Sequence, residues 1–341
     1  MKEILKKIPK IELHCHLDGS VRPETMYELL IKDGEKIEVK DMNEFENLVA
    51  VKEECKSLKE YLEKFSFPLR VMQKSENIER ITYELLEDLS KQNVKYVEIR
   101  FAPFLHMAEG LTFDEVVESV LKGIERAKKD FNILSNAILI CMRHESGDNS
   151  LKVVEHGEKY LGKGVVAVDL AGNEHDFPPE IHKDAFQLAY KKGYKITIHA
   201  GETGIVENIP KSIELLHAER IGHGIAAIKD LKVMELLKEK NIFLEMCPTS
   251  NLQTKAVDSI ESYPIRRYIE EGVGVTINTD NTTVSNTSLE KEYKFLMDKL
   301  NFSIEEILML IDNSIEAAFI SREEKESLRE IMKKELQELG L

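Results

Sequence analysis

Short apolar segments rich in β-branched residues alternate with amphipathic segments along most of the chain. Near-continuous apolar runs are typical of strands that are covered on both faces, as in parallel sheets. Between them a repeat close to 3.6 residues predicts helices, most clearly over Phe113–Lys129 behind an N-cap at Thr112. The predicted strands are Ile11–His14, Val94–Arg100, Asn136–Met142, Val165–Leu170, Lys195–His199, Arg220–His223, Ile242–Cys247 and Gly274–Asp280.

This alternation of strands and helices predicts an α/β fold with a parallel sheet. The chain has 341 residues, and eight units favour a single (β/α)8 TIM barrel over 1–341, because that fold typically takes about 250 residues. An open doubly wound sheet is the alternative, but no Gly-x-Gly-x-x-Gly motif follows the first strand. The long gap before the second strand predicts a helical insertion over 23–90 at the barrel mouth, and further helices follow Asp280 at the C-terminus.

The acidic composition limits the partners. The formal net charge is −15, from 47 Lys and Arg against 62 Asp and Glu residues, so we expect no nucleic-acid partner. We also expect no membrane association, because no apolar run approaches the roughly 18 residues of a membrane span and Met1–Pro9 lacks the apolar core of a secretory signal. The cysteines lack metal-binding spacing and are too few for a disulfide framework, which predicts a cytoplasmic protein with reduced thiols. They are Cys15, Cys55, Cys141 and Cys247.

Two histidines at the end of the first predicted strand suggest a metal site. His14 and His16 are two residues apart, so on a strand their side chains point to the same side. A single buried histidine is more often a core residue with its hydrogen bonds made within the protein. Two histidines followed by Asp18 at the same two-residue spacing favour metal ligands instead. Cys15 faces the other way and is interpreted as an apolar filler.

Polar residues also follow three other predicted strands. His199 ends the fifth strand and Glu202 lies in the turn beyond it, His223 ends the sixth between two glycines, and Asp280 ends the eighth. Taken by itself, Glu202 would be interpreted as an exposed loop residue and Asp280 as the cap of the next helix. Together with His14 they lie at C-terminal strand ends, where barrels of this kind build their active sites. The other six of the ten histidines are assigned to surface or structural positions.

These residue types favour a catalytic metal with nitrogen and carboxylate ligands. Three neutral histidines, one aspartate and a water suit Zn²⁺, although Fe²⁺ or Co²⁺ would also fit. Such a metal lowers the pKa of its bound water to about 7. One histidine and one glutamate then remain: His223 can accept a proton from the attacking water and orient it, and Glu202 can deliver a proton to the substrate.

The motifs that carry these residues resemble the adenosine deaminase family of the zinc amidohydrolase superfamily. They follow the family order over nearly the whole chain, and together they are specific although each is short. The resemblance implies hydrolytic deamination of adenosine, and of 2′-deoxyadenosine, to inosine and ammonia in purine salvage. The matching segments are HCHLDGS (14–20), YVEIRFAP (96–103), VDLAGNE (168–174), HAGE (199–202), RIGHG (220–224), CPTSN (247–251) and NTDN (278–281).

The resemblance also implies roles for the catalytic residues. Glu202 would protonate purine N1, and His223 would position the hydroxide that attacks C6. Asp280 would hydrogen-bond to the same hydroxide. One zinc ion per chain would be held by His14, His16, His199 and Asp280.

For the nucleoside substrate, the resemblance implies that the Gly172 backbone N–H binds purine N3 and that Asp18 holds the ribose 5′-hydroxyl. His16 would lie beside the substrate. The animal enzymes carry a second aspartate where this chain has Asn281, whose amide can still donate to purine N7. Positions of a hydrophobic lid are matched by Tyr61 and Phe65.

Several alternatives stay open. An adenine deaminase is one alternative, although it would not need Asp18 to hold a ribose. An AMP deaminase is another, but it would need cationic side chains for the phosphate at the place where Asp18 would repel it. A third is a deaminase of a 5′-modified adenosine such as aminofutalosine. The RNA-type zinc deaminases are excluded, because the chain has no C-x-x-C motif. A non-catalytic nucleoside-binding protein on the same fold is the alternative from another class, against which Glu202 and the ligand set argue.

Overall fold

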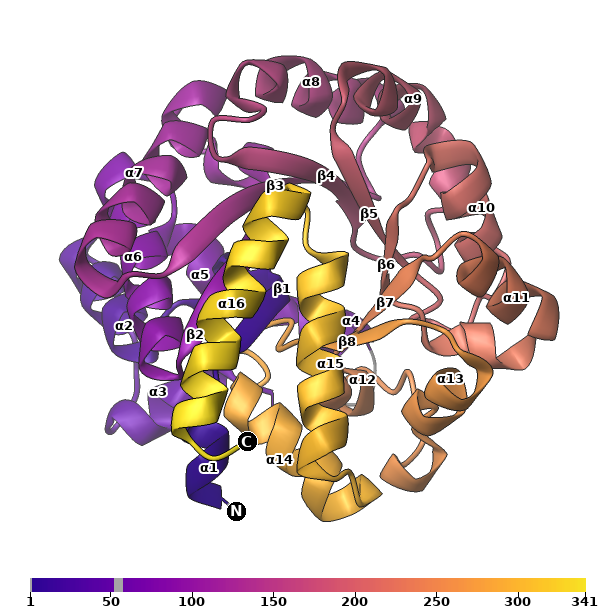
Figure 1. Cartoon of the computed structure of the whole chain (residues 1–341). Helices are drawn as coiled ribbons and strands as arrows, with labels where there is room; N and C mark the ends of the chain where they lie inside the picture. The colour runs from indigo at the N-terminus through magenta and orange to yellow at the C-terminus, as the bar shows by residue number, and fades with distance from the viewer. Residues whose placement is uncertain (1, 52–57) are drawn as a thin grey trace.

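Eight parallel strands form a ring in which each strand pairs with the next one in sequence (Figure 1). The computed structural model describes residues 2–51 and 58–341. Helices surround the ring, so the predicted (β/α)8 TIM barrel is confirmed. The strands are β1 (Lys10–His16), β2 (Val94–Phe101), β3 (Leu134–Met142), β4 (Val165–Ala171), β5 (Lys195–Ala200), β6 (Arg220–His223), β7 (Phe243–Met246) and β8 (Val275–Ile277).

Several of the surrounding helices begin or end at residues that cap them. The Thr112 side chain accepts a hydrogen bond from the Glu115 N–H in a capping box, and Gly193 ends the α9 helix with φ 85°. Apolar side chains on the inner faces of these helices pack on the strands and form one continuous core. Apart from the helices at the barrel mouth, the helices between strands are α6 (Ser75–Lys91), α7 (Phe113–Phe131), α8 (Gly147–Gly157), α9 (Lys183–Lys192), α10 (Asn208–Leu216), α11 (Leu231–Glu239), α12 (Pro248–Gln253) and α13 (Ile265–Glu271). The last strand, β8, is followed by α14 (Leu289–Leu300) and α15 (Ile304–Ala317).

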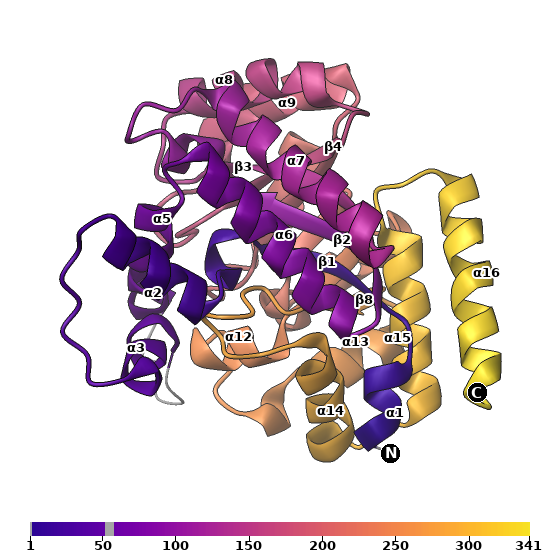
Figure 2. The ribbon, with the colours of Figure 1, turned by 90° about the vertical axis from the view of Figure 1, so that its left-hand side faces the viewer.

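The segment predicted as a helical insertion, 23–90, contains two kinds of helix. Its last helix, α6, packs beside α7 in the outer ring. The α2 and α3 helices lie on the side of the barrel away from the C-terminal helix α16 (Figure 2). Outside the ring the chain forms α1 (Lys2–Lys7), α2 (Pro23–Lys32), α3 (Met42–Val49), α4 (Leu58–Glu63), α5 (Ser66–Val71) and α16 (Arg322–Glu338).

The barrel closes between β1 and the residues that follow β8. His16 N–H donates to the Asp280 carbonyl (2.7 Å), and Asp280 N–H donates to the His14 carbonyl (2.8 Å). The predicted strand Gly274–Asp280 is therefore wrong in length: β8 ends at Ile277, and Asp280 adopts φ 61°. These two hydrogen bonds bring Asp280 beside two histidines that precede it by more than 260 residues.

The opposite end of the barrel is closed by the connection between α15 and α16. Phe319 N–H donates to Glu98 Oε1 (2.6 Å), and Arg220 Nη1 donates to the Ala317 carbonyl (2.9 Å). The Arg220 guanidinium also lies 3.6 Å from the centre of the Phe319 ring. The C-terminal helices thus seal the end of the barrel that lies away from the predicted site.

The cysteines take no part in the predicted site. Cys15, Cys141 and Cys247 are buried free thiols, and Cys15 Sγ lies 3.5 Å from Ser20 Oγ. Cys55 lies outside the described residues. Within residues 2–51 and 58–341, the helices are too short or too polar to cross a bilayer.

A buried histidine after β2 predicts a loss of stability in acid. Among the described residues, neither ring nitrogen of His106 has a well-formed hydrogen bond, and burial lowers its pKa to about 4 against a smaller opposing effect of the Met72 backbone. The unfolded chain therefore binds a proton near pH 6.5 that the folded chain does not, so stability falls as the pH drops from 6.5 to 4. The full loss for this group is about 3 kcal/mol.

Urea unfolding of His106→Met at pH 7.5 and pH 4.5 tests this prediction. We expect the free energy of unfolding to fall by about 2–3 kcal/mol less in the variant than in the wild type. His175→Met, at an exposed position, is the matched control and should behave like the wild type. Equal acid losses in wild type and His106→Met would contradict the prediction.

Candidate functional site

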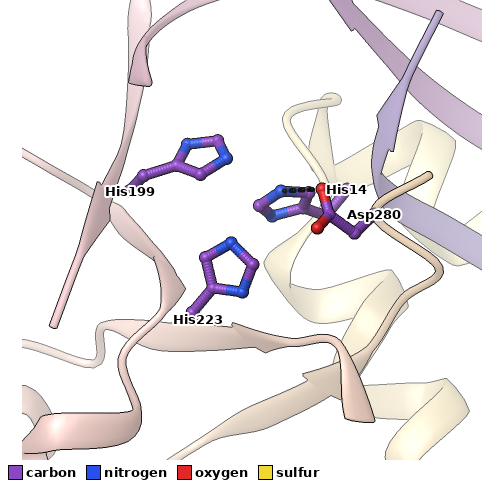
Figure 3. Close-up of side chains that lie close together, drawn as sticks. All are labelled: His14, His199, His223 and Asp280. Carbon is purple, nitrogen blue, oxygen red and sulfur yellow. Dashed lines mark ion pairs between the residues drawn. The ribbon is translucent and has the colours of Figure 1, made fainter. Parts of the chain in front are cut away.

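Side chains from three places on the ring meet at its C-terminal end. His14 and His16 lie on β1, His199 lies on β5, and Asp280 follows β8. His16 Nε2 is 3.2 Å from His199 Nε2, and Asp280 Oδ1 is 3.4 Å from His14 Nε2 and 3.3 Å from His16 Nε2. Figure 3 shows His14, His199 and Asp280 turned toward one space, with His223 beside them.

The spacing of these atoms fits a tetrahedral metal site. A tetrahedron with metal–nitrogen distances of about 2.0–2.1 Å has edges of about 3.3–3.4 Å, close to three of the separations between these atoms, 3.2, 3.3 and 3.4 Å. The four described residues whose ligand atoms all lie within 4.8 Å of one another are His14, His199, His223 and Asp280, a set that includes His223 in place of the predicted ligand His16. His14 Nε2 is fully buried and has no hydrogen-bond partner among the described residues, although buried polar atoms are normally paired. We therefore regard this group as a candidate divalent metal site.

Two carboxylates behind the site fix the orientation of two of its histidines. His14 Nδ1 lies 2.8 Å from Glu245 Oε2, and His199 Nδ1 lies 3.1 Å from Asp169 Oδ1. An ionised carboxylate only accepts hydrogen bonds, so each ring carries its proton on Nδ1 and directs the Nε2 lone pair into the site. Both histidines thus have the form that a metal needs.

These carboxylates belong to a fully buried ionic network inside the barrel. Arg100 donates to Asp169 (2.9 Å) and Glu245 (2.8 Å), and Arg220 donates to Glu245 (2.6 Å) and Glu98 (2.6 Å). Sequence analysis assigned no role to these five residues. The sequence did contain a signal for them: each is a charged residue within an otherwise apolar strand. A buried charge without a partner is costly, so such a residue implies a buried partner of opposite charge.

The charges of this cluster also favour a divalent cation. Its three carboxylates and two guanidinium groups leave one negative charge, and Asp280 adds a second. Burial acts to raise the pKa of Asp280, but the His14 side chain 3.4 Å away and the other neighbouring imidazoles lower it well below its usual value. Asp280 is therefore ionised, and a cation of charge +2 would neutralise the cluster.

Glu202 and His223 face each other at the edge of the metal site. Glu202 Oε2 lies 3.7 Å from His223 Nε2, and both side chains are buried. Burial, together with the negative charges of Asp280 and Glu174, raises the pKa of Glu202 to about 8. The Glu202 carboxyl group is therefore protonated at neutral pH and can act as a proton donor.

His223 differs from the other histidines in the position of its proton. Asn251 Oδ1 accepts from the Cys247 N–H (3.3 Å) and from the Tyr263 hydroxyl (3.1 Å). A backbone N–H can only donate, so Asn251 must turn its Nδ2 toward His223 Nδ1, 2.9 Å away. The neutral ring then carries its proton on Nε2. Although the His223 ring lies within the candidate metal group, this form gives the site a donor and not a metal ligand.

A cavity of about 370 Å³ opens onto this group of side chains. The predicted site residues line it, except His14, which does not reach its wall. The described lining residues include no lysine or arginine, and Asp18 is buried there with a pKa raised to about 6 by burial. His144, to which sequence analysis assigned no role in the site, also lines the wall. The predicted residues on the cavity are His16, Asp18, Tyr61, Phe65, Gly172, His199, Glu202, His223, Asp280 and Asn281.

Comparison with known proteins places these features in one family. The family model described as adenosine deaminase matches residues 9–335. The adenosine deaminase of Clostridium kluyveri is 51% identical over 330 residues, 97% of this chain and 95% of that protein. The adenosine deaminase of Clostridium acetobutylicum is 52% identical over 328 residues, 96% of this chain and 98% of that protein.

Solved structures match over the same length. The adenine deaminase from Arthrobacter aurescens has a TM-score of 0.89 at 26% identity, covering 97% of this chain and 99% of that one. The N6-mAMP deaminase of Arabidopsis has a TM-score of 0.87 at 29% identity, covering 97% of this chain and 99% of that one. The likeness therefore extends over the whole barrel together with its added helices.

Proposed function

Because the chain belongs to the adenosine deaminase family, we propose that it hydrolyses adenosine and 2′-deoxyadenosine to inosine or deoxyinosine and ammonia, in purine salvage. The observation that carries this proposal is the buried Glu202 carboxyl group beside a candidate metal-binding group on one cavity. A cytoplasmic location is part of the proposal, since the three described cysteines are free thiols.

The metal would be Zn²⁺, held by His14, His16, His199 and Asp280. When bound, zinc supplies a water molecule that is activated for attack at neutral pH. His223 is left out of the ligand set because its neutral form carries a proton on Nε2. Carboxylate partners on the Nδ1 side of His14 and His199 support their assignment as ligands.

The remaining residues would handle the protons of the reaction. Glu202 donates its proton to purine N1, which makes C6 more susceptible to attack. His223 Nε2–H donates to the incoming oxygen and holds it in line with C6, while Asp280 accepts from the same oxygen. The two protons of the consumed water end on N1, by way of Glu202, and on the departing ammonia. The products are therefore an N1–H ketone ring and NH₃.

Three further residues would orient the nucleoside. The Gly172 N–H would donate to purine N3 and the Asn281 amide to N7, while Asp18 would accept from the ribose 5′-hydroxyl. Gly172 adopts φ 109°, a conformation that favours glycine and leaves its N–H beside the cavity. Asp18 would carry a negative charge beside the 5′ position of the ribose, and the described cavity wall holds no lysine or arginine that could bind a phosphate group. The site therefore favours the free nucleoside over a 5′-nucleotide.

An absorbance assay of the conversion of adenosine to inosine tests this function. We expect rapid turnover by the metal-loaded protein, loss of activity to background after treatment with a chelator, and recovery on addition of Zn²⁺. Adenine and AMP, tested at the same concentration, should have much lower kcat/KM values. Negligible turnover of adenosine by metal-loaded protein would overturn the proposal.

A further inference from the structure

A tyrosine on α4 contacts the residue that we expect to bind the purine ring. The Tyr61 hydroxyl lies 2.8 Å from Asn281 Nδ2 and 2.6 Å from Ser285 Oγ. All three side chains are buried, and both Tyr61 and Asn281 line the cavity. The hydroxyl therefore joins a helix at the barrel mouth to the loop that follows β8.

The Asn281 amide needs such a partner because its two ends differ chemically. Its nitrogen can donate to purine N7, whereas its oxygen would repel that ring nitrogen. The oxygen lies close to Gly19, where an added Cβ would be 1.7 Å from it, and has no hydrogen-bond partner among the described residues. The hydrogen bond from Nδ2 to the Tyr61 hydroxyl is thus the contact that holds the nitrogen end of the amide among the described residues.

We infer that Tyr61 is a specificity-determining positioning residue: its hydroxyl, held by Ser285, turns the Asn281 amide so that an N–H faces N7 of the bound purine. This inference rests on the proposed function, since it takes a purine nucleoside as the ligand. The Tyr61 hydroxyl accepts one N–H of Asn281 and shares a hydrogen bond with the Ser285 hydroxyl, which leaves the second N–H of the amide for the substrate.

The position of Tyr61 also couples base recognition to the helices at the mouth. Tyr61 packs with Val51 and Val284 in a small apolar cluster that is separate from the main core. In addition, Val51 N–H donates to the Val284 carbonyl (2.7 Å). The loop after β8 thus contacts both α4, through Tyr61, and the end of the segment that follows α3, through Val51, so the place of Asn281 depends on how this loop packs against the mouth of the barrel.

The test compares purines with and without the N7 acceptor. In 7-deazaadenosine a C–H group replaces N7, so the compound gains nothing from an oriented amide. For Tyr61→Phe we expect the ratio of kcat/KM for adenosine to that for 7-deazaadenosine to fall by about 3- to 10-fold, the effect of one hydrogen bond. Ser285→Ala should lower the ratio in the same direction, and Tyr83→Phe, which removes an exposed hydroxyl bonded to Asp130, should leave it unchanged.

A binding measurement separates this inference from the proposed function. The dissociation constants of inosine and 7-deazainosine, measured by calorimetry on metal-loaded wild type and Tyr61→Phe, should show the same shift in ratio without any turnover. An equal loss for both ligands would overturn the inference, because it would mean that Tyr61 only packs. Wild type that binds these ligands but does not deaminate adenosine would overturn the proposed function, and the binding ratio would still decide the role of Tyr61.

Discussion

Replacing Glu202 by glutamine is expected to lower kcat for adenosine by about 10²- to 10⁴-fold, the usual contribution of a positioned general acid. The glutamine amide keeps the size of the side chain and can donate a hydrogen bond to N1, but it cannot transfer a proton. The loss should therefore be in kcat and kcat/KM, with a smaller change in KM. Steady-state kinetics on metal-loaded protein measure the effect.

Two further measurements identify the cause of that loss. Metal content and the midpoint of thermal unfolding should match the wild type, since Glu202 lies beside the proposed ligand set and is not a member of it. Glu207→Gln, an exposed position five residues later, is the matched control and should retain full activity. Near-normal kcat in Glu202→Gln would refute the role of proton donor.

Glu245→Gln is expected to cost about 3–5 kcal/mol in free energy of unfolding, as for the loss of one partner in a buried ion pair. Burial acts to raise the pKa of Glu245, but Arg100 and Arg220 outweigh this effect and hold it well below its usual value, so the wild-type side chain is charged. In the variant, two buried guanidinium groups lose a shared counter-ion. Chemical denaturation with metal present and absent measures the cost.

The same substitution should weaken metal binding by about 10- to 100-fold, the usual effect of losing the partner of a ligating histidine. Glu245 accepts from His14 Nδ1 (2.8 Å), so without the carboxylate the Nε2 lone pair is less firmly directed into the site. Competition with a chromophoric chelator gives the affinity. Glu306→Gln removes a half-buried carboxylate bonded to Arg266 (2.9 Å) at the protein surface and should cost less than about 1 kcal/mol. The interpretation fails if Glu245→Gln matches this control in stability and metal affinity.

The barrel and most of the candidate site could be predicted from sequence because the relevant signals are local. Strands covered on both faces are uninterrupted apolar runs, and the C-terminal ends of parallel strands meet at one edge. Residues such as His199 and Asp280 could therefore be assigned to one site although they belong to separate sequence motifs. The end of β8 was mispredicted because Asp280 leaves the regular strand conformation while its backbone still pairs with β1.

The chemical form of each histidine could not be predicted, because it depends on partners distant in sequence. His14 and His223 both lie in the C-terminal part of an apolar strand, yet His14 meets a carboxylate 231 residues away and His223 meets an amide 28 residues away. An acceptor fixes the proton on Nδ1 and a donor fixes it on Nε2, so these partners separate a candidate metal ligand from a hydrogen-bond donor. Likewise, Glu98 and Arg100 were visible as charges within a strand, but only the packed barrel shows which charges face them.

The closure of the barrel between β1 and the residues after β8 also sets an order of events during synthesis on the ribosome. His14 and His16 leave the exit tunnel more than 260 residues before Asp280 does. Until then the first strand has no neighbour on one side, and two of the proposed ligands lack their carboxylate partner. A nascent chain therefore cannot hold the metal with its full ligand set before the residues that follow β8 have been made, which delays acquisition of the metal until the barrel can close.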